Sequence, residues 1–129
     1  MRLSKTISTV LLSLASTSLL FSALPASAKN KSPWGFVSCS GYIQKTYNTT
    51  QNVAIYSGVF YNAEMKMYSE GKVLSSFGKY RRANYPKFNE NSCTYWDYET
   101  ERQAKDALND KIADSKRFEF KVIRTGYEY

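Results

Sequence analysis

Two cysteines are the most reactive side chains of this chain, and the sequence contains no histidine. Without an imidazole the chain lacks the usual general base near neutral pH, which excludes Ser-His-Asp and Cys-His nucleophiles. Metal binding by Cys39 and Cys93 is poorly supported, because the chain has no histidine and no Cys-x-x-Cys spacing of the kind that structural zinc sites use. We therefore predict neither a metal site nor a cofactor.

Carboxylates are the remaining groups that could act as acids and bases. Asp97, Glu99 and Glu101 cluster where a helix is predicted to begin. A glycoside hydrolase needs two carboxyl groups across a cleft, about 5 to 9.5 Å apart. Acidic residues are also expected at a helix N-terminus, because they interact favourably with the helix dipole. We predict no catalytic residue, and a weak carboxylate-based hydrolase remains an alternative that a cleft holding Asp97 opposite another acid would favour.

The first 28 residues have the features of a signal peptide. Arg2 and Lys5 form a positive start, residues 7–24 form an apolar run, and small residues precede a cleavage point after Ala28. We predict an exported protein, periplasmic or secreted, with no transmembrane segment after cleavage. Nucleic acid is not an expected partner in that compartment.

Export changes the expected state of the two cysteines. An even, small number of cysteines in an oxidising compartment indicates a structural disulfide, which we assign to Cys39 and Cys93. The remainder of the chain is long enough for one small domain. We predict a flexible leader over residues 29–33 and a single domain over residues 34–129.

The first half of the domain is predicted to contain two strands and a helix. Residues 34–44 and 53–61 have the composition of strands, with a polar loop over 46–52 between them. Gly58 lies inside the second strand, where glycine usually marks a bulge or a close backbone approach. Helical spacing predicts a helix over 72–83, preceded by a loop or short extra turn over 62–70 because Gly71 weakens any helix through it.

The second half is predicted to be a strand, a helix and a strand. Residues 86–91 form a loop, and residues 92–98 form an aromatic strand. Thr100 and Gln103 then form a capping box that begins a helix, and a final strand covers 118–123. The predicted core residues are Phe60, Phe77, Phe118 and Phe120.

These elements predict an α+β fold. The order is β-β-α-β-α-β, with about four mostly antiparallel strands in one sheet. One layer of two helices covering this sheet would bury every apolar face.

Two surface features suggest ligands. Four aromatic residues on strands could stack on sugars, namely Tyr42, Tyr56, Trp96 and Tyr98. Residues 71–88 contain five basic residues and no acid, namely Lys72, Lys79, Arg81, Arg82 and Lys87. Such a run is usually a solvated face. It could also bind an anionic cell-wall polymer, a membrane surface or an acidic protein.

Two short patterns carry a resemblance to a known family. The segment Tyr56-Ser57-Gly58-Val59-Phe60, together with Ala104 and Leu108 after an aromatic strand, resembles the sporulation-related repeat domains that bind peptidoglycan. The chain departs from that pattern by its extra first strand and by the long stretch after Phe60. The layout is also similar to small uncharacterised domains exported by bacteria.

The predicted function is therefore an exported, non-enzymatic binding or interaction module. The resemblance implies a peptidoglycan- or glycan-binding domain as one alternative, and an inhibitor or immunity-type partner of another protein is a second. A protruding loop over 62–70 would favour the second alternative.

Overall fold

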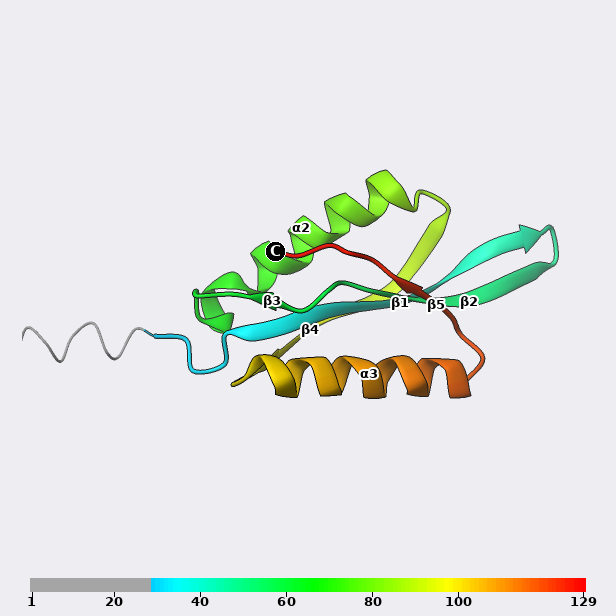
Figure 1. Ribbon diagram of the computed structural model, residues 1–129. Coiled ribbons are helices and arrows are strands. Elements are labelled where there is room, and N and C mark those ends of the chain that lie inside the picture. Colours follow the sequence, from blue (N-terminus) through cyan, green and yellow to red (C-terminus); the bar gives the residue numbers. More distant parts are fainter. Residues whose placement is uncertain (1–28) are drawn as a thin grey trace, which may run out of the picture.

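The computed structural model describes residues 29–129, and the predicted signal peptide lies outside the described residues. The elements are β1 (Trp34–Thr46), β2 (Thr49–Tyr56), β3 (Phe60–Tyr61), α2 (Lys66–Asn84), β4 (Phe88–Tyr98), α3 (Glu101–Arg117) and β5 (Lys121–Arg124) (Figure 1). The predicted α+β class, with two helices and one disulfide, is confirmed within these residues. The sheet has five strands where about four were predicted.

β1 is the central strand because it pairs along both of its edges. β4 runs antiparallel to β1 on one edge, and β2 does so on the other. β3 continues the line of β2 after a break, and β5 pairs with β2 in parallel. Gly58 lies in the break and donates its amide hydrogen to Tyr127 O at 2.8 Å. The predicted second strand is thus two strands. A Cβ on Gly58 would lie 3.4 Å from Tyr127 O, an ordinary contact, so glycine is not required at this position.

The two helices lie on opposite faces of the sheet (Figure 1), so the predicted single helical layer is wrong. β2, β4 and β5 all run parallel to one another, so α2 and α3 each lie in a crossover between parallel strands. Such crossovers are right-handed. The first crossover passes from β2 to β4, and the second returns from β4 to β5. Two crossovers of the same hand that travel in opposite directions must cover opposite faces.

Each face of the sheet has its own core, because successive side chains of a strand point to opposite sides. Val37 is buried on the α2 side with the predicted core residues Phe60 and Phe77. Its neighbour Phe36 is buried on the α3 side with Leu108. The small domain therefore has two thin cores, each covered by one helix.

α2 begins at Lys66, earlier than the predicted residue 72, and it runs through Gly71. A side chain on Gly71 would meet open space, so glycine is not required there. The cost of a helical glycine, about 1 kcal/mol, is offset by packing on both sides of it. Ser69 is buried and accepts a hydrogen bond from the Asn62 amide at 2.8 Å. The segment before α2 is therefore short and anchored, and the predicted loop over 62–70 is helical from Lys66 on. The protruding loop that would favour a protein partner is not formed there.

Two strands begin earlier than predicted, and both extensions replace expected loops. β2 begins at Thr49, after a tight turn at residues 47–48. β4 begins at Phe88 instead of residue 92. Gly41 of β1 pairs with Glu90 in this extension. A Cβ on Gly41 would lie 2.1 Å from Asn89 O. The close approach at this position requires glycine.

The last strand is shorter than predicted. β5 begins only at Lys121, and Phe118 ends α3 as its C-cap residue. Phe118 is 69% exposed, so the prediction that it belongs to the core is wrong. Phe120 is half-buried against the α3-side core. Glu119 has a φ of 65°, a left-handed conformation that interrupts the strand pattern before Phe120.

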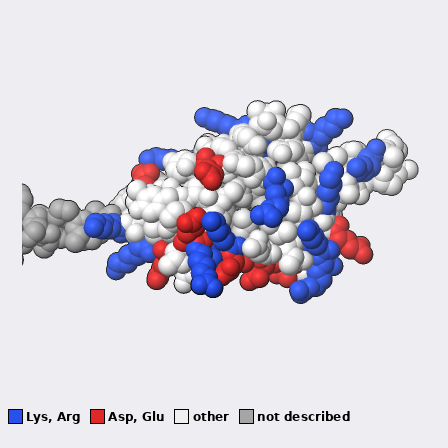
Figure 2. Space-filling view, viewed as in Figure 1, with Lys and Arg blue, Asp and Glu red and all other residues white. Residues whose placement is uncertain are grey.

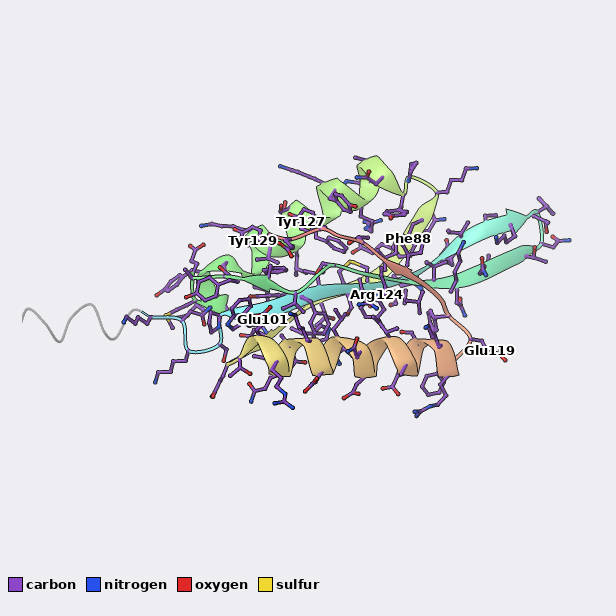
Figure 3. All side chains as sticks on the ribbon, in the orientation of Figure 1. Phe88, Glu101, Glu119, Arg124, Tyr127 and Tyr129 are labelled. Carbon is purple, nitrogen blue, oxygen red and sulfur yellow. A yellow bond between two sulfur atoms is a disulfide. The ribbon has the colours of Figure 1, made fainter. Side chains whose placement is uncertain are left out.

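The segment after β5 runs back beside α2 and carries Tyr127 and Tyr129 (Figure 3). The Tyr127 ring packs against Phe77 and Tyr80, with centroids 5.4 and 4.9 Å away. Tyr129 lies against Phe60, with centroids 5.9 Å apart. The C-terminal residues therefore help to close the α2-side core.

α3 begins as the sequence predicts. The Thr100 hydroxyl accepts a hydrogen bond from the Gln103 amide at 3.1 Å, and the Gln103 side chain accepts one from the Thr100 amide at 3.2 Å. We expect Thr100→Ala to lower the free energy of unfolding by about 1 kcal/mol. The Gln103 amide loses its acceptor, and the reciprocal hydrogen bond from the residue-100 amide to the Gln103 side chain is weakened. Urea unfolding followed by circular dichroism measures this change. Thr100→Ser should retain most of the stability, and an equal loss in both variants would contradict the capping role.

Candidate functional site

The predicted disulfide is present and joins β1 to β4. Cys39 and Cys93 face each other directly in the antiparallel register, with their Cα atoms 4.0 Å apart. Cys39 is buried in the α2-side core, and Cys93 is half-buried beside it. The Glu90 carboxylate contacts the Cys93 sulfur, and these three residues are the one group of metal-ligating type among the described residues. Because the two sulfurs are bonded to each other, only the carboxylate could act as a ligand.

Arg81 belongs to the interior instead of to a basic surface. Its side chain is 5% exposed, and Nη2 lies 3.1 Å from Glu90 Oε2. The guanidinium also stacks over the Phe88 ring, 5.1 Å from its centroid. The prediction that Arg81 contributes to a positive surface is wrong, because the long side chain of this residue turns into the α2-side core edge.

The other basic residues of this stretch are exposed. Lys72 pairs with Glu64 at 3.0 Å, which partly neutralises its charge and raises the pKa of the Lys72 ammonium. Lys79, Arg82 and Lys87 remain exposed, and anionic binding by these three stays a prediction. On the face seen in Figure 2, lysine and arginine side chains are spread out and not gathered into one patch.

Two of the predicted stacking residues are covered by α3. Tyr56 is 4% exposed, and its hydroxyl donates a hydrogen bond to Lys111 O at 3.0 Å. Burial raises the pKa of this hydroxyl, Ser115 lowers it and Asp114 raises it. Trp96 donates its ring N–H to Ser38 Oγ at 2.9 Å and lies under the Lys111 ammonium, 3.4 Å from the ring centroid. Neither ring is open to a sugar, because α3 covers Tyr56 and the Lys111 side chain covers the Trp96 ring.

The other two stacking residues lie farther apart. Tyr42 is half-buried on the far part of β1, where it pairs with Asn52 and Asn89. Tyr98 is half-buried at the end of β4 and stacks on Phe36 at 6.1 Å. Burial raises the pKa of the Tyr98 hydroxyl, the Asp97 carboxylate raises it further, and Lys66 lowers it. The structure therefore does not assemble the four aromatic residues into one stacking platform.

An open groove lies between the end of β4 and one side of α3, with a volume of about 590 Å³. It is lined by Ser32, Asp97, Tyr98, Glu99, Gln103, Asp106, Ala107 and Asp110. Four of these eight side chains are carboxylates, and none is lysine or arginine. We call this feature the acidic groove.

The acidic groove contains part of the predicted carboxylate cluster and adds two acids to it. Asp97 and Glu99 line it, whereas Glu101 lines another hollow and pairs with Lys105 at 2.8 Å. Asp106 and Asp110 join them from α3, because residues four apart share a helix face. The sequence signal for these two groove residues is a pair of acids at helical spacing. Such a like-charge pair does not stabilise an isolated helix.

Asp97 has a partner of its own at the rim of the groove. Its Oδ1 atom lies 3.2 Å from Lys66 Nζ at the start of α2. Glu99, Asp106 and Asp110 make no ion pair within residues 29–129. The groove can therefore attract cations or donate its carboxylates as hydrogen-bond acceptors.

Comparison of the chain with protein-family models, curated proteins and solved structures gives no match. Within residues 29–129, neither helix is long and apolar enough to cross a membrane. The disulfide is consistent with an oxidising compartment.

Proposed function

We propose that this chain is an exported, non-enzymatic binding module, and that the acidic groove binds a positively charged ligand. One observation carries the proposal: four carboxylates and no basic side chain line one groove of a domain with excess positive charge. Without Arg2 and Lys5, the chain has 16 basic and 11 acidic residues, a net charge of +5. Grouping negative charge against that excess favours cationic partners by electrostatic complementarity.

The other binding alternatives have less support. A glycan-binding site would use stacked aromatic rings, and Tyr98 alone among the four candidates lines the groove. An inhibitor or immunity-type protein is compatible with the proposal, since a protein surface can supply the positive charge. Of the five basic residues predicted to bind an anion, Arg81 is buried and Lys72 is paired with Glu64, which leaves Lys79, Arg82 and Lys87.

A second candidate function is weak carboxylate-dependent hydrolysis. Asp97 and Glu99 line the same groove as Asp106 and Asp110, and a two-carboxylate mechanism needs two acids in one cleft. The ion pair of Asp97 with Lys66 and the open form of the groove support binding instead. Release of reducing sugar from peptidoglycan, lost in Asp97→Asn and Glu99→Gln, would establish the hydrolase in place of the binding module.

The binding proposal is tested with hexalysine as a cationic probe, titrated calorimetrically at low ionic strength. We expect Asp106→Asn/Asp110→Asn to weaken binding about fivefold to tenfold, since each exposed charge pair contributes about 0.2–1 kcal/mol. We also expect the affinity of the unsubstituted protein to fall as salt rises.

The matched control removes two acids outside the groove, in Asp114→Asn/Glu119→Gln. Both residues are exposed, and neither lines the groove. An equal loss of hexalysine affinity in the two double variants would mean that net charge alone sets the binding. That result would contradict a site in the acidic groove.

A further inference from the structure

The directions of the backbone N–H and C=O groups in β4 can be deduced from the hydrogen bonds of its neighbour β1. Val37 directs both its amide and its carbonyl away from β4, because the amide donates to Ser57 Oγ at 2.7 Å and the carbonyl accepts from Ser57 N at 2.9 Å. In an antiparallel ladder the directions alternate residue by residue. Val37 is opposite Tyr95 in the register, so these two residues do not exchange backbone hydrogen bonds.

The same alternation determines the backbone hydrogen-bond directions in the neighbouring residue pairs. Cys93 and Asp97 are opposite Cys39 and Gly35, which have the same parity as Val37. The amides and carbonyls of Cys93, Tyr95 and Asp97 therefore point away from the sheet. Within residues 29–129 no backbone group pairs with them. β4 is thus an open edge strand over residues 92–98.

Edge strands are commonly protected against pairing with other chains, and β4 is protected over only part of its length. A bulge lies where Ser40 pairs with Ser92 and Gly41 with Glu90, which leaves Asn91 without a partner. Bulges of this kind twist an edge and hinder pairing. The register from Ser92 to Tyr98 is regular, and Thr94 is exposed there. This regular part ends at the acidic groove.

We propose that an extended segment of another protein, with lysine or arginine at alternate positions, adds to the sheet as a strand along residues 92–98 of β4. The inference rests on the proposed function and names its ligand class. Strand addition gives affinity through main-chain hydrogen bonds and specificity through alternate side chains. One face of the added strand lies on the α3 side, where its basic side chains pair with the carboxylates of the groove.

Charge favours a foreign segment over a second copy of this chain. A second copy would bring its own β4, which carries Glu90, Asp97 and Glu99 in or next to the strand. Those acids would add negative charge to an edge that already ends at four carboxylates, and like charges at an interface oppose association. A basic segment replaces this repulsion with attraction.

The experiment uses the oxidised protein and the peptide acetyl-Thr-Lys-Val-Lys-Val-Lys-Thr-amide, with two N-methylated isomers as matched controls. One isomer is methylated on two lysine amides and the other on both valine amides. In an added strand the amides of one parity face β4 and those of the other face solvent. Charge and side chains are the same in all three peptides.

We expect calorimetry to show binding of the unmodified peptide, weakened by Asp106→Asn/Asp110→Asn. Only one N-methylated isomer should lose affinity, by about tenfold or more, because backbone hydrogen bonds are lost at more than one position. Hydrogen exchange at the Cys93, Tyr95 and Asp97 amides should slow in the complex.

Three results would overturn the inference, and they separate it from the proposed function. Groove-dependent binding with equal affinity for both isomers would retain the cationic site and reject strand addition. No groove-dependent binding of any peptide would reject both proposals. A dimer in analytical ultracentrifugation that the peptide dissociates would assign the edge to a second copy of the chain.

Discussion

Removal of the Cys39–Cys93 disulfide should lower the free energy of unfolding by about 2–5 kcal/mol. The two cysteines are 54 residues apart in sequence, and closing a loop of this length restricts the unfolded chain by about 4 kcal/mol. The effect should be large because the domain has two thin cores, each covered by a single helix. A small domain has little stability in reserve.

The disulfide prediction is checked by urea unfolding of Cys39→Ala/Cys93→Ala. The matched control is Ser40→Ala/Ser92→Ala, the next cross-strand pair, whose hydroxyl oxygens lie 3.1 Å apart at the surface. We expect the control to change stability by less than about 1 kcal/mol. A similar loss in both variants would show that local packing, and not the covalent bond, sets the difference.

Glu90→Ala should be the most destabilising single replacement of a charged residue, with a loss of about 3 kcal/mol. The Arg81 guanidinium is buried, and Glu90 is its sole ion-pair partner among the described residues. Its Nε atom already lacks a hydrogen-bond partner within these residues. Removing the carboxylate therefore leaves a buried cation with only the Phe88 ring to stabilise it.

The test compares Glu90→Ala with Arg81→Met and with the double variant, again by urea unfolding. Arg81→Met should cost less, because methionine fills much of the same space and leaves the half-exposed Glu90 in contact with water. The double variant should recover most of the stability lost in Glu90→Ala. Additive losses in the double variant would mean that the two residues act independently.

Local signals in the sequence predicted the elements better than their arrangement. The capping box of Thr100 identified the start of α3 correctly, because both hydrogen bonds form within four residues. The predicted start of α2 was wrong, because side-chain contacts outside the helix stabilise its first turn. Ser69 is held by Asn62, which also donates to the Tyr95 hydroxyl at 3.2 Å across the fold. No local propensity contains that contact.

The side of the sheet that each helix covers depends on strand order, which short-range patterns do not encode. Once β5 is known to pair with β2 beyond β1, the handedness of crossovers places α2 and α3 on opposite faces. The same limit applies to the candidate site. Asp97 and Asp106 come to line one groove only through this placement of α3, and the pairing of the buried Arg81 with Glu90 joins α2 to β4.

The central place of β1 has a consequence for how the chain reaches its oxidised state. β1 precedes the other strands in sequence, yet one of its edges is completed by β4, after β2, β3 and α2. During synthesis from the N-terminus, the hairpin of β1 and β2 can form while Cys39 still has no partner. An unpaired thiol and an open strand edge on that intermediate favour crosslinking between chains. Crowded, newly made chains should therefore be the ones at risk of covalent dimerisation, and dilution should protect them.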